Sequence, residues 1–364
     1  MPKTPAPPLK SQQAKLKSRF PAQLLLWNET ENDRQMPWKG EHDPYKIWLS
    51  EVILQQTRVE QGRGYYERFI KAFPTVRHLA KAPEQAVFKL WEGLGYYSRC
   101  RNLIASAKII MENHKGVFPS DYTSILSLKG IGPYTAAAIA SFAFDLPYAV
   151  LDGNVFRVLS RIYDIELPID STEGKKHFTE LAQSLLPNSQ PGQYNQALMD
   201  FGATICKPVP ECAHCFYNSW CLAYKKGKQF LLPIKEKKTL VRKRWFNYIL
   251  LHYKGSVALH QRTDKDIWQQ LYEPLLIESP KKLSKKALFQ QLEAEYDIKQ
   301  NDFELSGTIT EHTQRLSHQL IHFSFLQLHL LRKPKLPRSF ICVPLAQLSQ
   351  FPFPKSIKAF LLEQ

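Results

Sequence analysis

The stretch from Leu128 to Asn154 constrains the fold more than any other part of the chain. It opens with Leu-Lys-Gly-Ile-Gly-Pro-Tyr-Thr, in which Gly130 and Gly132 precede a proline that suits the first turn of a helix. The pattern predicts two helices joined by a tight hairpin, whose backbone N–H groups and helix N-terminus would face a phosphate. An ordinary connection between two helices is the alternative interpretation. About one helix length after the hairpin turn, Asp152 stands between an apolar run and a glycine.

The charge balance favours an anionic partner. Lys and Arg number 49 against 33 Asp and Glu, a formal net charge of +16 in 364 residues. Such a field attracts nucleic acid, because lysines and arginines release counterions from phosphates; solubility alone is the other explanation. No run approaches the roughly 18 apolar residues of a membrane span, and residues 1–10 lack the apolar core of a secretory signal. We expect a monomer of a bacterial cytoplasm, associated with DNA and not with a membrane.

Composition divides the chain into four expected parts. Residues 1–19 are basic and rich in proline, which predicts a disordered tail. Residues 20–224 are predicted to be mainly helical, with short Gly/Pro connections. Residues 225–244 carry nine Lys/Arg against one Glu and are predicted to be a basic linker. In residues 245–364, strand patterns at 247–253, 256–261 and 318–330 alternate with helices at 282–296 and 355–362, which predicts an α+β domain.

A predicted helix from Tyr45 to Gln61 carries one carboxylate on its apolar face. Glu51 lies three or four positions from Ile47 and Leu54, so the three side chains share a face. Apolar neighbours desolvate a carboxylate and favour its protonated form. A solvated glutamate on an exposed helix is the alternative interpretation.

A turn at residues 93–98, Gly-Leu-Gly-Tyr-Tyr-Ser, joins two further predicted helices. It is expected to display Leu94 and two tyrosines, as apolar wedges do where a protein opens stacked bases. Packing inside the protein is an equally common use of such side chains. The other predicted helices span residues 21–27, 65–72, 75–81, 83–91, 98–113, 155–163, 175–186 and 194–206.

Four of the six cysteines lie within sixteen residues of each other: Cys206, Cys212, Cys215 and Cys221. Four thiolates this close hold either an iron–sulfur cluster or a tetrahedral zinc ion. Zinc sites usually show two close cysteine pairs separated by a longer loop, whereas here only Cys212 and Cys215 form such a pair. The spacing therefore favours a [4Fe–4S] cluster.

Five motifs in this order resemble those of the MutY-type adenine DNA glycosylases, a branch of the endonuclease III-like helix-hairpin-helix superfamily. They are Ser-Glu-Val-Ile-Leu-Gln-Gln-Thr at 50–57, Gly-Leu-Gly-Tyr-Tyr-Ser-Arg at 93–99, Leu-Lys-Gly-Ile-Gly-Pro-Tyr-Thr at 128–135, Leu-Asp-Gly-Asn at 151–154 and the four cysteines. The resemblance implies a mainly α N-terminal catalytic region of two helical lobes with an iron–sulfur loop, and a C-terminal domain of Nudix-like fold. It also implies excision of adenine mispaired with 8-oxoguanine, or with guanine, in double-stranded DNA.

The resemblance assigns the chemistry to four residues. Glu51 would protonate adenine at nitrogen 7, for which it must hold a proton that a free glutamic acid, with a pKa of about 4.3, has lost near neutral pH. Asp152 would stay ionised and stabilise an oxocarbenium-like sugar, a division of labour similar to that in glycoside hydrolases. Tyr134 and Asn154 would orient these groups and the water. In lyase members a lysine takes the place of Tyr134, so the resemblance implies a monofunctional glycosylase that leaves an abasic site.

The resemblance implies three further sets of residues. Those expected to fill or wedge the duplex at the mismatch are Gln56, Leu94 and Tyr96. Those expected to bind the DNA backbone at the hairpin are Lys129, Gly130 and Gly132. Those expected to line the adenine pocket are Arg34, Trp38, Leu54, Val59 and Gln196.

The chain departs from the family in two places. Ser317 and His318 match a Phe-Ser-His loop that reads 8-oxoguanine, whereas Leu316 stands where the family has phenylalanine. Five residues separate Cys206 from Cys212, where the family usually has six. The C-terminal domain also lacks the run of glutamates and arginine of true Nudix hydrolases, so lesion recognition is expected there and nucleotide hydrolysis is not.

Three alternatives stay open. An endonuclease III-like glycosylase and lyase for oxidised pyrimidines is disfavoured by Tyr134 and by the extra C-terminal domain. A catalytically silent DNA-binding module would need neither Glu51 nor Asp152. A Nudix-type hydrolase ranks last, because its metal-binding motif is missing.

Overall fold

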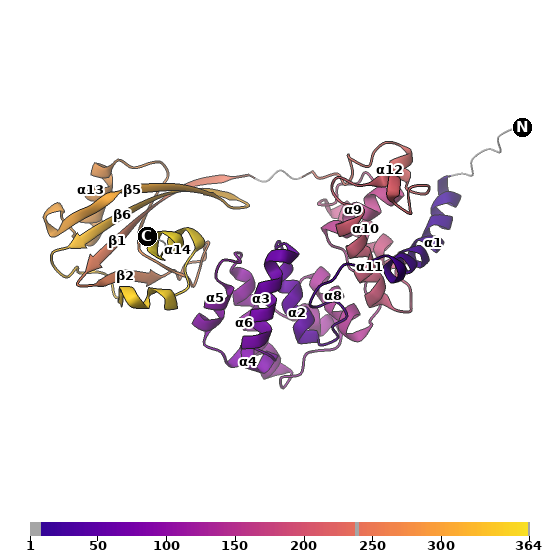
Figure 1. Cartoon of the computed structure of the whole chain (residues 1–364), viewed down its shortest axis with the longest axis horizontal. Coiled ribbons are helices and arrows are strands. Elements are labelled where there is room, and N and C mark those ends of the chain that lie inside the picture. Colours follow the sequence, from indigo (N-terminus) through magenta and orange to yellow (C-terminus); the bar gives the residue numbers. More distant parts are fainter. Residues whose placement is uncertain (1–8, 237–239, 363–364) are drawn as a thin grey trace, which may run out of the picture. The chain divides into compact units, whose positions relative to one another are not determined.

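The computed structural model describes residues 9–236 and 240–362, and it divides into two compact units (Figure 1). Unit 1 combines the described residues up to Lys81 with residues 105–236. Unit 2 combines Ala82–Ile104 with the described residues from 240 onward. Helix α6 (Ser98–Asn113) runs from unit 2 into unit 1.

This division differs from the continuous helical domain predicted for residues 20–224. Ala82–Ile104 belongs with the C-terminal residues because several of its side chains bond to them. The Glu92 carboxylate accepts hydrogen bonds from Phe353 N at 2.9 Å and from Lys358 Nζ at 2.6 Å. Sequence periodicity carries no information about such long-range partners.

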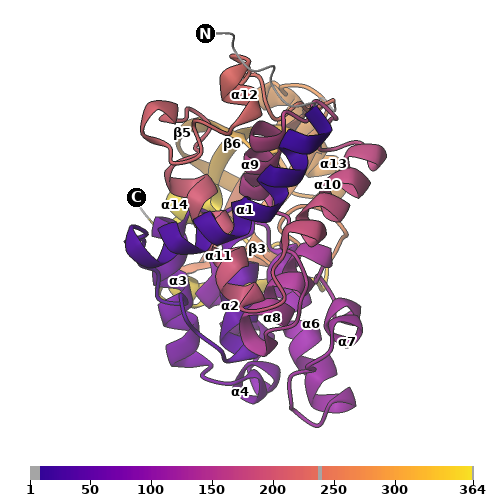
Figure 2. The same ribbon diagram turned by 90° about the vertical axis from the view of Figure 1, so that its right-hand side faces the viewer.

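Unit 1 is helical, as predicted. Helix α1 packs against α10 and α11, and α11 also contacts α8 and α9 (Figure 2). The helices of unit 1, apart from α6, are α1 (Leu9–Thr30), α2 (Pro44–Leu54), α3 (Val59–Ala72), α4 (Val76–Lys81), α7 (Tyr122–Ser127), α8 (Pro133–Phe144), α9 (Gly153–Tyr163), α10 (Thr172–Leu185), α11 (Pro191–Thr204) and α12 (Leu222–Lys225).

Helix α1 is longer than the sequence suggested. The predicted disordered tail is wrong for residues 9–19, which are helical, while residues 1–8 of that prediction lie outside the described residues. Pro21 lies inside the helix and does not end it. Phe20, Leu24 and Trp27 are spaced so as to share one face, and all three are buried in the core of unit 1. Burial of this face outweighs the local cost of the proline.

The helix predicted from Tyr45 to Gln61 is two helices. Helix α2 ends at Leu54, Gln56 adopts a left-handed φ of 58°, and α3 begins at Val59. The break lets α3 fold back onto α2 at a close contact, where a Cβ on Gly62 would lie 2.8 Å from Leu54 Cδ2. The sequence did not predict this turn, because its helical pattern continues from Tyr45 to Gln61.

The predicted helix-hairpin-helix is present as α7, a turn and α8. Asp121 caps α7 by accepting from Ser124 N at 2.9 Å. Gly130 has a φ of 78°, a conformation that favours glycine, and Gly132 is the N-cap residue of α8. The turn is exposed at Lys129, Gly130 and Gly132, so its backbone is open to a ligand.

Unit 2 contains a mixed sheet covered on both faces by helices. Strand β1 pairs in parallel with β6 and antiparallel with β2 and β4, in the order β3-β2-β1-β6-β5. Helix α13 packs on one face of the sheet and α14 on the other, because alternate β1 side chains enter two separate cores. The elements are α5 (Glu84–Trp91), β1 (Arg242–Tyr253), β2 (Ser256–Gln261), β3 (Tyr272–Glu273), β4 (Leu275–Ser279), α13 (Lys285–Tyr296), β5 (Phe303–Arg315), β6 (Gln319–Leu330), β7 (Phe340–Pro344) and α14 (Lys355–Leu362).

The α+β prediction for the C-terminal part is confirmed, with one correction at its start. Strand β1 begins at Arg242, so the last three residues of the predicted linker 225–244 belong to the sheet. Residues 237–239 of that linker lie outside the described residues. None of the helices in the described ranges has both the length and the apolar character needed to cross a membrane.

Candidate active site

Glu51 and Tyr134 meet in the interior of unit 1. Glu51 lies in the last two turns of α2, where its side chain is buried, and Tyr134 lies in the first turn of α8. The Tyr134 hydroxyl donates to Glu51 Oε2 at 2.6 Å, and Met199 Sδ lies 3.7 Å from the same hydroxyl. The hairpin thus places a phenol on the carboxyl group that the sequence singled out.

Asp152 is held by the start of α9, of which it is the N-cap residue. Its Oδ1 accepts from Val155 N and its Oδ2 from Asn154 Nδ2, both at 2.7 Å. Arg157, one turn later, donates from Nη2 to Asn154 Oδ1 at 2.8 Å. The carboxylate is therefore fixed by two direct donors, one of which is itself held by an arginine.

Glu51 and Asp152 differ in the neighbouring groups that shift their pKa values. Burial raises the pKa of Glu51 to about 7, the Tyr134 hydrogen bond opposes this shift, and the charge of Asp152 adds to it. Burial also raises the pKa of Asp152, but the bonds from Val155 and Asn154 and the positive charge of Arg157 act in the opposite direction. More donors stabilise the ionised form of Asp152 than that of Glu51. This arrangement favours a protonated Glu51 beside an ionised Asp152.

A cavity of about 750 Å³ opens beside Glu51. Of the five residues expected in the adenine pocket, Trp38 and Gln196 line this cavity. Arg34 donates instead to the buried Asp200 at 2.7 Å. Leu54 and Val59, at the facing ends of α2 and α3, are half-buried and are not among the described residues that line the cavity.

Several residues that line the cavity were not among those predicted from the sequence. Lys39, Glu41 and His42 enter the lining from the loop before α2, and Gln190 enters from the residue before α11. Gln190 has a left-handed φ of 58°, a rare conformation for a residue with a side chain. The sequence predicted this helix only from residue 194 onward and did not indicate that Gln190 lines a cavity.

The turn at residues 93–98 displays one wedge candidate. The prediction that it displays Leu94 and two tyrosines is wrong for Leu94 and Tyr97, which are 5% and 6% exposed. Positive φ angles at Gly93 and Gly95 curl the turn back onto α5, so that Trp91 Nε1 donates to Gly95 O at 2.9 Å. Tyr96 is 44% exposed. In unit 1, Gln56 is also exposed.

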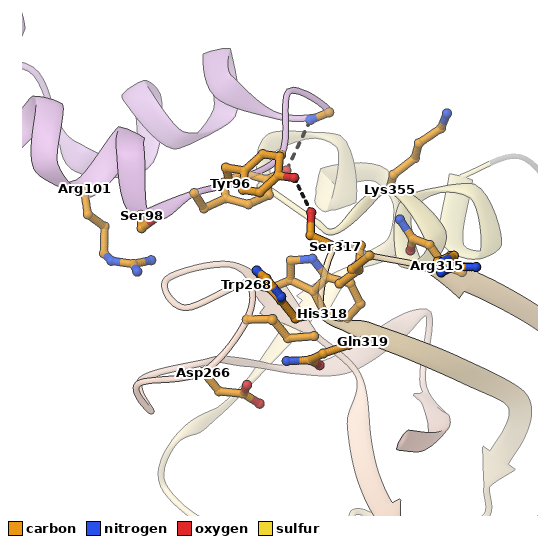
Figure 3. Close-up of a pocket in the computed structure, with 16 residues that line it drawn as sticks. Tyr96, Ser98, Arg101, Asp266, Trp268, Arg315, Ser317, His318, Gln319 and Lys355 are labelled. Atoms are coloured by element: carbon orange, nitrogen blue, oxygen red, sulfur yellow. Dashed lines mark hydrogen bonds between the residues drawn. The ribbon is translucent and has the colours of Figure 1, made fainter. Parts of the chain in front are cut away.

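A second cavity, of about 560 Å³, lies within unit 2 and brings Tyr96 to the predicted lesion-reading loop. Ser317 and His318 line it from the tip of the β5–β6 hairpin, and the Tyr96 hydroxyl hydrogen-bonds to Ser317 Oγ. Figure 3 shows this bond as a dashed line, with Trp268 and His318 on the far side of Ser317. Leu316 lines the cavity and packs partly against the core of the sheet, and the cavity's aromatic side chains are those of Tyr96, Tyr97 and Trp268.

The four clustered cysteines line one small cavity at the end of unit 1. No three His, Cys, Asp or Glu side chains in the described part of the chain are placed to hold a single metal ion. The all-sulfur donor set, gathered around one cavity, fits an iron–sulfur cluster, and four thiolates also fit a zinc ion. Arg161 is buried beside it, with Nη1 at 3.5 Å from Cys206 Sγ and 2.6 Å from Lys207 O. This arginine holds the shortened loop and places a positive charge next to the first thiol.

Two family models match this chain, one in its helical N-terminal part and one in its C-terminal part. Residues 49–187 match the family model of the HhH-GPD superfamily of base excision DNA repair proteins, and residues 247–363 match that of the NUDIX domain. The adenine DNA glycosylase of Buchnera aphidicola subsp. Baizongia pistaciae is 39% identical over 251 residues, which cover 68% of this chain and 71% of that protein. The chain belongs to the adenine DNA glycosylase family.

Other relatives agree with this assignment. The human adenine DNA glycosylase is 40% identical over 220 residues, covering 58% of this chain and 40% of the human protein. A thermostable thymine-DNA glycosylase superposes with a TM-score of 0.54 at 29% identity, over 59% of this chain and 99% of that one. A trapped endonuclease III–DNA intermediate, with a TM-score of 0.50 at 19% identity over 58% of this chain and 98% of that one, shares the fold. The resemblance found in the motifs is thus confirmed for the family and the fold.

Proposed function

We propose that this DNA glycosylase of base-excision repair hydrolyses the N-glycosidic bond of adenine with Glu51 as general acid and Asp152 as the stabilising carboxylate. The hydrogen bond from Tyr134 to the buried Glu51, whose pKa is raised to about 7, is the observation that carries the proposal. Double-stranded DNA with an 8-oxoguanine:adenine mispair is the proposed substrate. Action as a monomer in a bacterial cytoplasm stays a prediction.

The reaction needs one proton donor and one fixed negative charge. Glu51 gives its proton to adenine nitrogen 7 while the bond from nitrogen 9 to the sugar breaks and its electron pair leaves with the base. Asp152, oriented by Asn154 and Val155, stabilises the positive charge that develops on the sugar. Water then adds its hydroxyl group to the anomeric carbon and releases a proton to a carboxylate. The products are free adenine and an abasic site.

Tyr134 supports hydrolysis without strand cleavage. A lyase needs an amine at the sugar, whereas here the hairpin residue bonds through a phenol to Glu51. Lys129 lies in the exposed turn, and its carbonyl accepts from Ser106 Oγ at 2.9 Å. We therefore propose that the turn with Lys129, Gly130 and Gly132 binds the phosphate backbone while Tyr134 serves the acid.

The cavity shared by Tyr96, Ser317 and His318 supports reading of 8-oxoguanine at the hairpin tip. We predict that the double variant Ser317→Ala, His318→Ala loses about tenfold in its preference for 8-oxoguanine:A over G:A duplexes, because polar contacts to the lesion are removed. The measurement compares single-turnover rates on the two duplexes. His329→Ala, at an exposed histidine of β6 that is not among the described residues lining this cavity, is the matched control and should keep the wild-type preference. An unchanged preference in the double variant would refute the role of the loop.

The four cysteines are proposed to hold a [4Fe–4S] cluster, which when bound would tie the end of unit 1 together and take no part in the hydrolysis. Arg157 links this region to the acid site, since its Nε donates to Cys206 O at 2.8 Å while its Nη2 holds Asn154. We predict iron and acid-labile sulfide in equal amounts and the broad visible absorption of a cluster. Cys212→Ser should lower both contents and the melting temperature, whereas Cys342→Ser should change neither. Bound zinc without sulfide would contradict the assignment.

A further inference from the structure

Asp200 is a buried carboxylate that no part of the chemistry above uses. It lies on α11, one turn after Gln196, and its side chain is fully buried. It accepts from Gln196 Nε2 at 2.9 Å, from Arg34 Nη1 at 2.7 Å and from Asn32 Nδ2 at 2.9 Å, and Lys39 Nζ lies 3.4 Å away. The carboxylate therefore ties the loop before α2 to the helix that lines the cavity beside Glu51.

The bond from Gln196 to Asp200 fixes which way the Gln196 amide points. A carboxylate paired with two cations only accepts hydrogen bonds, so the NH₂ group of Gln196 must face it. The amide oxygen, Oε1, is then turned the other way, and in the part of the chain that the structure describes no group donates to it. Gln196 and Glu51 line the same cavity. Gln196 therefore supplies an acceptor, Oε1, and Glu51 supplies an acid. The lining also includes the carboxylates of Glu29, Glu41 and Asp145.

This pair complements one edge of adenine. That edge presents an acceptor at nitrogen 7 and a donor at the 6-amino group, whereas guanine presents two acceptors there. We infer that Asp200 is a positioning residue that sets base specificity, by holding the Gln196 carbonyl where it accepts from the 6-amino group of adenine. With the amide reversed, an NH₂ group would meet the amino group and both would lose a partner. The inference rests on the proposed placement of adenine in this cavity.

The test compares adenine with purine, which lacks the 6-amino group, each placed opposite 8-oxoguanine. Single-turnover rates give the adenine-to-purine ratio for each protein. The two glycosidic bonds differ in intrinsic reactivity, but this difference is the same for every variant and does not affect the comparison of ratios. D200N should lower this ratio about tenfold, because its new amide no longer dictates the orientation of Gln196. D200N/Q196E should restore it, since a carboxylate accepts through either oxygen. Q196E alone should lower the rate on both bases, because two carboxylates would then lie in contact.

Two controls separate specificity from damage to the fold. N32A removes a different donor from Asp200 and should keep the wild-type ratio, and melting temperatures identify any variant that has not folded. If D200N does not fold, the test compares D200N/Q196E with Q196A. The adenine-to-purine ratio should match that of the wild type in D200N/Q196E and should be lowered in Q196A. Equal losses on adenine and purine in D200N would overturn the inference and leave a purely structural role. Failure of the wild-type protein to release adenine would refute the proposed function instead.

Discussion

Glu51→Gln is expected to abolish adenine release while DNA binding is retained. The amide keeps the shape of the side chain and can still accept from Tyr134, but it has no proton to give to nitrogen 7. General acid catalysis contributes about 10²–10⁴-fold in rate, so a loss of this order is predicted. The measurement is single-turnover adenine release together with the dissociation constant for the same duplex. Near-normal turnover by this variant would contradict the role of Glu51.

The free energy of unfolding shows whether the inactive Glu51→Gln variant has kept its fold. The folded-state pKa of Glu51 is raised to about 7 from an ordinary value of 4.5, so this group stabilises the fold less as pH rises from 4.5 to 7, and the loss is complete above 7. The buried charge then costs on the order of 3 kcal/mol, at about 1.4 kcal/mol per pKa unit. Glu51→Gln should therefore be more stable than the wild type at pH 8 and closer to it at pH 5. An inactive variant that is more stable at pH 8 has lost a proton donor and has kept its fold.

The rate of adenine release should fall as pH rises through about 7. Glu51 is active in its protonated form, and burial sets the pKa at which that form is lost. Above this value the rate should drop about tenfold per pH unit, because each further pH unit lowers the protonated fraction of Glu51 about tenfold. Single-turnover rates between pH 5 and 9 give the profile.

Tyr134→Phe provides the matched variant for this profile. The hydroxyl stabilises the ionised form of Glu51, so its removal should raise the pKa of Glu51 and shift the fall in rate to higher pH. The contact between the two helices is otherwise preserved. No shift would show that Tyr134 does not act on Glu51, and a shift to lower pH would show that its hydroxyl stabilises the protonated form; either result would contradict this assignment.

The sequence predicted the identity of the acids better than their contacts. The apolar face around Glu51 indicated burial, and the structure buries it. The bond to Tyr134 joins residues 83 positions apart, and no local pattern predicts such a pair. Asp200 and Gln196, four positions apart on one helix, could have been noticed as a pair, but the partner Arg34 lies 166 positions away.

The helix predictions failed where tertiary packing decided the outcome. Helix α1 continues through Pro21 because its apolar face is buried, and the α2–α3 break allows the close approach of the two helices at Gly62. Leu94 is buried because two glycines bend its turn inward. The sequence motif did not predict this direction of the turn. Local pattern located the elements, and contacts between distant residues set their ends.

The central claim is tested most directly by following one duplex that carries 8-oxoguanine opposite adenine and one that carries an oxidised pyrimidine. Wild-type protein should release adenine from the first duplex, with strand scission only after alkali treatment, and should leave the second intact. Strand scission of the first duplex without alkali, or release of the oxidised pyrimidine without release of adenine, would contradict a monofunctional adenine glycosylase built on Glu51, Tyr134 and Asp152.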